Sequence, residues 1–228
     1  MECYLTYLKG HNADVNSLST SGNIMASGSD DGTVRIWDLN THKSVRRVTD
    51  EFFFPSKSVE NVSLSGFSLF TSTESRLFLF DIRNPSKILV TQSISTHTFS
   101  DEISQISQIN NIGCLSLDNG EIVIFNTNTL EIQSIYQCHN NICSSAQIIS
   151  ENYIISGGFD CRLKVTHFDG TEFSDLDFYD FFDNKSFNPP HIYTIASKGN
   201  EAAVGLGNGN ICLFFFFTIK KVLTQFLL

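Results

Sequence analysis

The sequence predicts an all-β fold built from about five repeated units, each of four antiparallel strands. Short apolar runs such as RLFLFDI, GEIVIFN and NICLFFF follow turn-prone Asp, Asn, Gly or Ser residues, a pattern typical of buried strands. No long apolar stripe of helical period accompanies them. When the runs are aligned, one column recurs at intervals of 43, 45, 41 and 48 residues, and it holds Trp37, Phe80, Phe125, Thr166 and Phe214.

A turn precedes each column residue by six positions. This turn column reads Asp31, Glu74, Asn119, Asp160 and Asn208. In three units the turn residue is followed by glycine, and Asp-Gly or Asn-Gly between two apolar strands favours a primed hairpin turn because both residues tolerate positive φ. Units of this length with a few short strands each are typical of β-propeller blades.

The first unit, residues 10–49, carries the fullest set of motifs. Gly10-His11 opens it, Ser27 lies on a predicted strand, Asp31 lies in the turn, and Trp37-Asp38 ends the next strand. A buried imidazole between a carboxylate and a hydroxyl satisfies its own polar groups and fixes a loop to a hairpin. We therefore interpret His11, Ser27, Asp31 and Trp37 as a structural network rather than a catalytic one.

The later units of the single predicted domain, residues 1–228, keep fewer motifs. Units 50–94, 95–137 and 186–228 keep the apolar strand and the turn. Unit 138–177 also keeps His139, Ser156 and Asp160, but has Thr166-His167 in place of Trp-Asp. The final apolar run is about ten residues, shorter than the roughly 20 of a membrane-spanning helix, and is interpreted as a core strand.

These motifs resemble the WD-repeat family, in which a Gly-His, a strand Ser, a turn Asp and a Trp-Asp ending bond to one another inside each blade. The resemblance implies a WD-repeat β-propeller of seven blades. Since five repeats fit, we expect an incomplete propeller and a chain truncated at its C-terminus. It also implies an interaction scaffold that binds other proteins.

Composition and charge bear on several classes of partner. The net charge of −9 repels a phosphate backbone, and Arg46 and Arg47 form only an isolated pair, so we expect no nucleic-acid partner. The N-terminal MECYLTYLKGH is too polar for a secretory leader, and the six cysteines are expected to be free thiols in the cytoplasm or nucleus. No membrane partner is predicted.

Motifs for catalysis, metals and cofactors are also not found. No sequence motif links a nucleophile, a base and an orienting acid. Cys138, His139, Cys143 and Cys161 do not have the paired spacing of a zinc site, and GLGNGN at 205–210 is interpreted as a hairpin turn. We predict a non-enzymatic protein without cofactor or metal. The alternative, an enzyme with a central-channel site, would need polar residues that runs such as ICSSAQII do not supply.

The first candidate partner-binding site is Phe80-Asp81-Ile82-Arg83, which stands where the first unit has Trp37-Asp38-Leu39-Asn40. It resembles the Trp-Asp-x-Arg box by which substrate receptors of cullin-4 ubiquitin ligases contact their adaptor, with Phe in place of Trp. Arg83 can present a bidentate fork to a partner, with Asp81 holding it in place. The alternative is a solvated arginine in a strand connection.

The second candidate is an acidic, aromatic insert at 172–184, where the repeat interval lengthens to 48 residues. It contains Glu172, Asp175, Asp177, Asp180 and Asp183, interleaved with Phe178, Tyr179 and Phe181. We interpret it as a docking loop, in which the aromatic residues contact a partner and the acidic residues attract it electrostatically. The alternative is a mobile insertion. The two sites correspond to two hypotheses: a cullin-4 substrate receptor, and a generic scaffold in a chromatin or trafficking complex.

Overall fold

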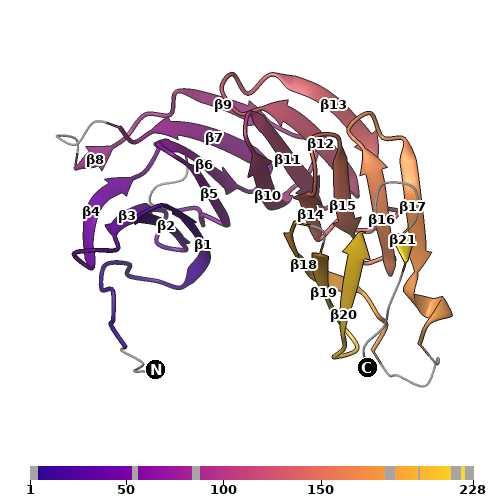
Figure 1. Cartoon of the computed structure of the whole chain (residues 1–228). Helices are drawn as coiled ribbons and strands as arrows, with labels where there is room; N and C mark the ends of the chain where they lie inside the picture. The colour runs from indigo at the N-terminus through magenta and orange to yellow at the C-terminus, as the bar shows by residue number, and fades with distance from the viewer. Residues whose placement is uncertain are drawn as a thin grey trace. The chain divides into compact units, whose positions relative to one another are not determined.

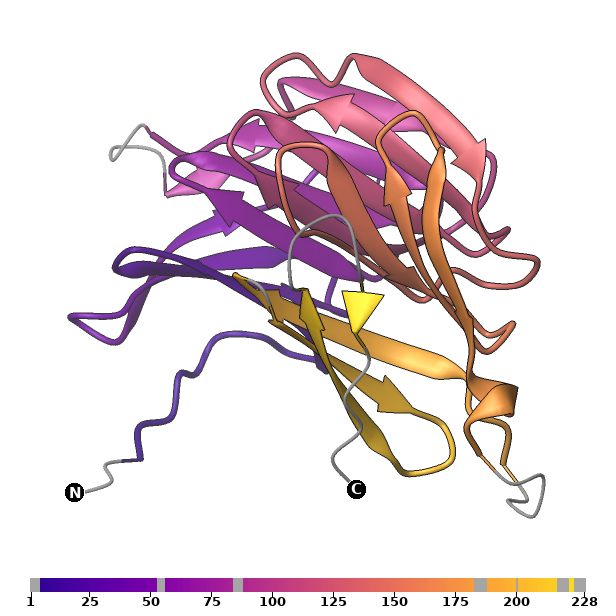
Figure 2. The same ribbon diagram turned by 45° about the vertical axis from the view of Figure 1, so that its right-hand side comes forward.

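The computed structural model describes residues 5–52, 56–83, 88–182, 188–199, 201–216 and 222–223. In this part of the chain the regular structure consists of β-strands and a single 3-10 helix. The chain divides into two compact units, Met1–Ile103 and Ser104–Leu228. Each sheet in them contains four strands in a meander, in chain order (Figures 1 and 2).

The first compact unit contains two sheets. The first sheet has β1 (Val15–Ser21), β2 (Ile24–Ser29), β3 (Val34–Asp38) and β4 (Lys43–Val48), and the second has β5 (Asn61–Ser65), β6 (Ser68–Thr73), β7 (Arg76–Asp81) and β9 (Ser95–Thr98). A short strand, β8 (Leu89–Val90), adds to the first sheet as a fifth member, parallel to β4. The sequence pattern did not predict this strand.

The second compact unit contains three four-stranded sheets. The third sheet has β10 (Ile103–Ile109), β11 (Ile112–Leu117), β12 (Glu121–Asn126) and β13 (Ile132–Gln137). The fourth has β14 (Ser145–Ile148), β15 (Tyr153–Gly157), β16 (Arg162–His167) and β17 (Glu172–Asp177), followed by the 3-10 helix η1 (Phe178–Asp180). The fifth has β18 (Ile192–Lys198), β19 (Glu201–Leu206), β20 (Ile211–Phe216) and β21 (Val222–Leu223).

The hairpin turns differ in detail from the prediction. Gly32 has φ 71°, but Asp31 is not among the described residues with positive φ, so this is not a primed two-residue turn. Instead the Gly32 N–H bonds to the Ser29 carbonyl at 3.2 Å, and the glycine ends a four-residue turn. Gly120 and Gly209 repeat this bond and the positive φ. The Asp31 carboxylate accepts the Thr33 N–H at 3.1 Å and so caps this loop.

The repeat column lies on equivalent strands. Its five residues are all buried on the third strand of their sheets: Trp37 on β3, Phe80 on β7, Phe125 on β12, Thr166 on β16 and Phe214 on β20. The predicted all-β class with about five four-stranded antiparallel sheets is therefore confirmed. That residues 1–228 form a single domain with the predicted unit boundaries stays a prediction.

Within each compact unit, consecutive sheets pack face to face in one repeated manner. We call the side of a sheet that carries its column residue the rear face, and the opposite side the front face, since alternate strand residues point to opposite sides. In the first unit, Val34 and Ile36 on the first front face share a core cluster with Phe80 on the second rear face. In the second unit, Ile122 and Ile124 pack likewise with Ala146, and Leu163 and Val165 pack with Ile195.

Candidate functional site

Asp81 and Arg83 form a solvent-accessible ion pair at the end of β7. The backbone N–H of Arg83 donates to Asp81 Oδ1 at 2.8 Å, and its Nε donates to Oδ1 at 3.0 Å and to Oδ2 at 2.8 Å. The Arg83 side chain hydrogen bond, followed by the backbone one, lowers the pKa of Asp81. The Arg83 side chain is nevertheless 73% exposed, so its guanidinium is paired with Asp81 and still accessible.

Phe80 does not belong to this accessible site, which corrects the prediction that it binds a partner. Its side chain is 0% exposed because it lies on the rear face of the second sheet, inside the core cluster of the first unit. Its ring stacks on Phe78 with centroids 6.3 Å apart. Ile82 is buried too, so the box alternates inward apolar residues with outward Asp81 and Arg83.

Phe67 is an exposed aromatic at the same end of the second sheet. Its carbonyl accepts the N–H of Ile82 at 2.9 Å, and its side chain is 54% exposed. The equivalent bonds in the first, third and fourth sheets go to carbonyls of asparagines, namely Asn23, Asn111 and Asn152. The sequence therefore already shows a Phe at a loop position where the first, third and fourth units have Asn. This position lies outside the third-strand column on which the repeats were aligned, and Phe67 was not predicted as a site residue.

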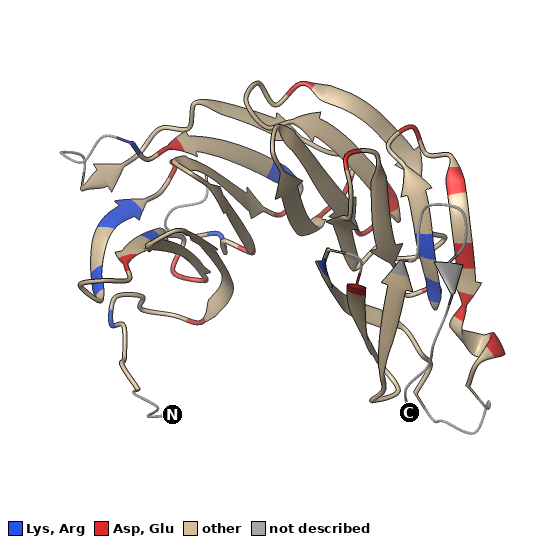
Figure 3. Cartoon of the chain, viewed as in Figure 1, with Lys and Arg blue, Asp and Glu red and all other residues tan. Residues whose placement is uncertain are grey.

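The acidic segment is a strand and not the predicted loop up to Asp177. Asp175 accepts Arg162 Nε at 2.8 Å and Asp177 accepts Arg162 Nη1 at 2.9 Å, while Lys164 Nζ lies 2.9 Å from Glu172. These cross-strand pairs between β16 and β17 balance the acids with bases from the neighbouring strand (Figure 3). Residues 172–177, predicted as part of a docking loop or a mobile insertion, are therefore a strand paired with β16.

The aromatic residues after β17 separate into two kinds. Phe178 is buried in the core of the fourth and fifth sheets, 6.1 Å from the ring of Phe214, which corrects its assignment as a partner contact. Tyr179 and Phe181 are nearly half exposed. The predicted docking segment is thus reduced to Tyr179, Asp180 and Phe181, because Asp183 lies outside the described residues.

The first sheet brings together all four residues of the predicted network. His11 lies between two side chains, with Nδ1 3.0 Å from Asp31 Oδ2 and Nε2 2.7 Å from Ser27 Oγ. The indole Nε1–H of Trp37 donates to the same Ser27 Oγ at 2.8 Å. Burial opposes the charge of Asp31, but hydrogen bonds from Thr33, Asn12 and His11 outweigh burial and lower its pKa.

The fourth sheet brings together the second predicted set. His139 Nδ1 lies 3.0 Å from Asp160 Oδ1, and Nε2 lies 2.9 Å from Ser156 Oγ. Burial opposes the charged form of His139, but hydrogen bonds to Asp160 and Cys138, with the electrostatic attraction of both groups, raise its pKa to about 9. Burial also opposes the charge of Asp160, but His139 and two backbone N–H donors lower its pKa.

A Ser–His–Asp order invites comparison with a hydrolytic triad, in which the serine oxygen must reach a substrate. Ser27 is 2% exposed and Ser156 is 0% exposed, so both hydroxyls are closed to a substrate. In the first sheet Ser27 is further engaged by Trp37. The geometry therefore suits a buried polar bridge between loop and hairpin.

The described ranges contain no group of three or more His, Cys, Asp or Glu residues placed to hold a metal ion. Five cysteines are free and buried, Cys114, Cys138, Cys143, Cys161 and Cys212, and Cys3 lies outside the described residues. No described helix is long and apolar enough to cross a membrane.

Comparison with known proteins shows what the chain is similar to. Residues 1–38 match the model "WD domain, G-beta repeat". The chain is 28% identical over 91% of its length to WD repeat-containing protein 53 homolog of Dictyostelium discoideum, covering 64% of that protein. It is 25% identical over 72% of its length to Protein SPA1-RELATED 4 of Arabidopsis thaliana, covering 21% of it. The chain thus spans less than two thirds of these relatives.

Solved structures show the same fold at low sequence identity. The WD40 β-propeller domain of Doa1 matches with a TM-score of 0.70 and 17% identity over 90% of this chain and 65% of that one. The computationally designed Ika8 protein matches with a TM-score of 0.73 and 20% identity over 94% of this chain and 62% of that one. The family model thus matches the start of the chain, and the five sheets are similar in fold to those of WD-repeat β-propellers.

Proposed function

We propose that the chain is a non-enzymatic interaction scaffold that docks the adaptor of a cullin-4 ubiquitin ligase through Asp81 and Arg83. WD-repeat propellers generally bind other proteins, which supports the scaffold. The finer assignment rests on one observation: the Arg83 guanidinium is held by Asp81 at 2.8 Å and is 73% exposed. The resemblance of residues 80–83 to the Trp-Asp-x-Arg box gives the adaptor as partner.

The geometry of the ion pair suits a docking contact. An arginine offers a planar fork that recognises carboxylates and carbonyl oxygens in two-point fashion. A free arginine loses rotamer freedom when it is bound, at a cost of roughly 0.5–1.5 kcal/mol. Because Asp81 already orients Arg83, part of this cost is met before the partner arrives.

Phe67 adds an apolar contact beside the fork. Binding interfaces concentrate their energy in aromatic anchors next to a few oriented polar groups. The loop position that presents asparagine in the first, third and fourth sheets presents Phe67 in the second, the sheet that also carries Arg83. We therefore include Phe67 with Asp81 and Arg83 in the proposed docking surface.

The test is titration calorimetry of purified adaptor with the wild-type chain, Arg83→Ala and Arg83→Lys. Truncating one partner of a buried interfacial charge pair costs roughly 2–5 kcal/mol, so Arg83→Ala should weaken binding about 30-fold or more. Arg83→Lys should also weaken it, since lysine keeps the charge but loses the fork.

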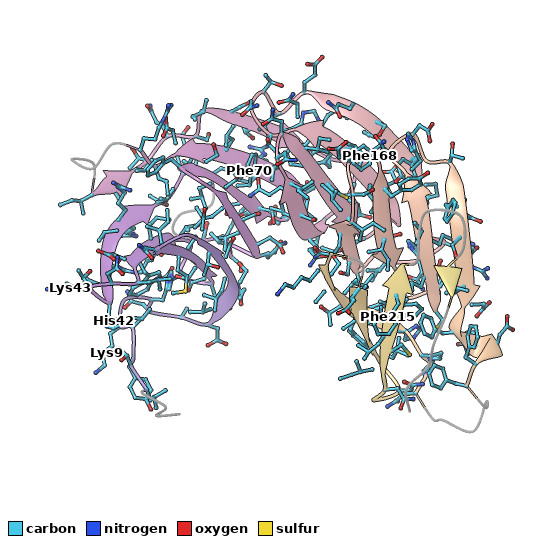
Figure 4. All side chains as sticks on the ribbon, viewed as in Figure 1. Lys9, His42, Lys43, Phe70, Phe168 and Phe215 are labelled. Atoms are coloured by element: carbon cyan, nitrogen blue, oxygen red, sulfur yellow. The ribbon has the colours of Figure 1, made fainter. Side chains whose placement is uncertain are left out.

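The matched control is Lys43→Ala. Lys43 is an exposed cation at the start of β4 in the first sheet, whereas residues 80–83 belong to the end of β7 in the second (Figure 4). Arg46 is less suitable because its Nε is buried without a hydrogen-bond partner within the described residues, so truncation would disturb β4 itself. No binding by the folded wild-type chain would reject the adaptor as partner; equal binding by all variants would reject Arg83 as its contact.

A second candidate function is a scaffold in a chromatin or trafficking complex that binds through the aromatic segment after β17. The observation in its favour is that Tyr179 and Phe181 are both nearly half exposed on one short turn while Phe178 anchors that turn in the core. In this case Tyr179→Ala combined with Phe181→Ala would abolish capture of the partner, and Arg83→Ala would leave it unchanged.

A further inference from the structure

A hollow of about 900 Å³ lies between the first and second sheets, inside the first compact unit. Asp50 and Glu51, which follow β4, line it together with residues 91–93, which follow β8. Arg76 lines it from β7 and Thr96 from β9. Strand β8 belongs to the connection between β7 and β9 but pairs with β4, so this connection joins the two sheets beside the hollow (Figure 1).

Arg76 is a partly buried cation in this hollow. Its guanidinium carbon lies over the ring of Phe52, 3.6 Å from the centroid. Lys57 Nζ lies 4.1 Å from the same centroid, but it also pairs with Glu74 at 2.8 Å. Among the described residues, the Arg76 side chain has neither an ion pair nor a hydrogen bond. The ring stabilises the positive charge, but it offers no oxygen atom to the N–H donors.

The fourth sheet shows how an arginine at this position is neutralised. Arg162 begins β16 as Arg76 begins β7, at the same distance before the column residue. Its Nε donates to Asp175 at 2.8 Å, and its Nη1 donates to Asp177 at 2.9 Å. Both carboxylates come from β17, the neighbouring strand of the same sheet, on which Asp177 is directly opposite Arg162.

The second sheet has no carboxylates at these two positions. Thr98 on β9 is directly opposite Arg76, as Asp177 is opposite Arg162, and Thr96 stands at the position equivalent to Asp175. A threonine hydroxyl carries no charge with which to neutralise a guanidinium. The neighbouring stretches of sequence, 53–55 and 84–87, contain no Asp or Glu. In the described part of the chain Arg76 therefore faces a hollow where Arg162 has two carboxylates.

We propose that this hollow binds an acidic segment of a partner protein, with one aspartate or glutamate side chain of that segment paired with Arg76. The argument is charge complementarity, for which the Arg162 pairs of the fourth sheet are the precedent. A guanidinium presents a planar fork that binds a carboxylate through two hydrogen bonds. Thr91, Gln92 and Thr96 also line the hollow and supply hydroxyl and amide groups for the backbone of the bound segment.

The acidic residues of the hollow restrict the charge of its occupant. Asp50 is engaged by its own loop and the facing one, because it accepts the Phe52 N–H at 3.1 Å and the Ser93 hydroxyl at 3.4 Å. Glu51 is exposed and forms no ion pair within the described ranges. Both carboxylates repel a doubly charged phosphate more strongly than a singly charged carboxylate. The hollow therefore suits an acidic side chain and not a phosphorylated one.

The test uses a short Gly-Ser peptide with one central glutamate, and two matched peptides with glutamine or phosphoserine in its place. Nuclear magnetic resonance follows the Nε–H signal of Arg76 as each peptide is added to the wild-type chain. The glutamate peptide should shift this signal until it saturates, and the glutamine peptide should not shift it. Tighter binding of the phosphoserine peptide than of the glutamate peptide would overturn the acidic side chain as occupant.

Two variants of the arginine test the contact itself. Arg76→Gln should weaken binding of the glutamate peptide at least about tenfold, measured from the backbone amide signals of Thr91 and Thr96. Arg76→Lys keeps the charge but loses the fork, so it should also weaken binding, and it serves alone if Arg76→Gln does not fold. The matched control is Lys43→Gln, which removes the same charge from the start of β4, whereas Asp50 follows the end of that strand.

Thr96→Asp distinguishes a binding role of Arg76 from a purely structural one. It places on β9 the carboxylate that Asp175 supplies in the fourth sheet, so Arg76 should pair within the chain. Binding of the glutamate peptide should fall at least about tenfold, while the unfolding temperature should not decrease. The control is Ser95→Asp, which adds the same charge on the opposite face of β9 and should bind the peptide as the wild type does.

Two further variants separate this site from its surroundings. Glu51→Gln should strengthen binding of the glutamate peptide, because a repelling charge is removed. Arg83→Ala should leave it unchanged, because Arg76 begins β7 and Arg83 follows its end, so this proposal and the one for Arg83 can fail separately. The absence of any shift of the Arg76 signal with the glutamate peptide would overturn the proposal. So would unchanged binding by a folded Thr96→Asp variant.

Discussion

The first and fourth sheets contain the same His–Asp–Ser bridge, but they complete it with different neighbours. In the first, the Ser27 hydroxyl also accepts the indole N–H of Trp37 at 2.8 Å. In the fourth, Thr166 stands at the tryptophan position and bonds instead to the Tyr136 hydroxyl at 2.8 Å. The Ser156 hydroxyl then contacts Cys138 Sγ at 3.3 Å. The bridge therefore forms without the Trp-Asp ending that marks it in sequence.

The carboxylates of the two bridges depend on their histidines to different degrees. Asp31 accepts the N–H groups of Asn12 and Thr33 and the Thr33 hydroxyl, in addition to His11. Asp160 accepts two backbone N–H groups and contacts His139 through both oxygens, at 3.0 and 3.1 Å. Residue 162 is an arginine and supplies no hydroxyl to replace the imidazole. Removal of His139 should therefore destabilise the fold more than removal of His11.

The largest expected effect tests this ranking by truncating each histidine. His139→Ala should lower the free energy of unfolding by about 3–5 kcal/mol, the range for breaking a buried ion pair. His11→Ala should cost roughly 1–3 kcal/mol, because Asp31 keeps three other donors. Denaturant unfolding monitored by circular dichroism measures both losses.

The control for this pair is His167→Ala, since the His167 side chain is 39% exposed and its removal should change stability little. Equal losses for His11→Ala and His139→Ala would contradict the ranking. Loss of a binding or catalytic activity without any loss of stability in His11→Ala would contradict the structural interpretation of the bridge.

The dependence of stability on pH should distinguish the two sheets next. The pKa of His139 is raised to about 9 in the folded chain, above its usual 6.5. The contribution of the imidazolium is therefore fully present below pH 6.5 and is lost as the pH rises through 9. By linkage this loss is on the order of 3 kcal/mol. Unfolding measured across pH 6 to about 10 should show the decline.

Two variants sharpen that measurement. His139→Ala should flatten the decline, because the titrating group is gone. His11→Ala should keep it, because the fourth sheet is intact. A decline of equal size in His139→Ala would assign the effect to another group. At the acid end, the lowered pKa of Asp160 predicts stability that is present above pH 3.8 and lost as the pH falls below it.

The sequence could predict the repeated sheets because the signal is local. Each column residue follows its own turn by six positions, so Phe214 and Phe125 could be aligned without knowing their neighbours in space. The bridge residues His11 and His139 were likewise found from short motifs within one unit.

Features that depend on neighbouring strands or sheets could not be predicted in this way. The burial of Phe80 and Phe178 follows from the sheet that covers each ring. The strand over Glu172–Asp177 depends on its register with β16, which sets Asp175 against Lys164 and so pairs acids with bases. Strand β8 is two residues long, and its pairing with Arg47 and Val48 has no periodicity to reveal it.

The smallest expected effect decides whether tryptophan is part of the bridge or only packed on it. Trp37→Phe removes the donor to Ser27 and keeps an aromatic ring, and should cost about 1 kcal/mol. The backbone N–H of Asn12 bonds to Asp31 at 3.0 Å, so its hydrogen exchange reports whether the loop is held. In Trp37→Phe this exchange should stay slow, because His11 still joins Ser27 and Asp31. In His11→Ala it should become fast. Fast exchange in both variants would make the indole of Trp37 a required member of the first bridge. The fourth sheet has Thr166 at the tryptophan position, so its bridge would then be a different arrangement and not a variant of the first.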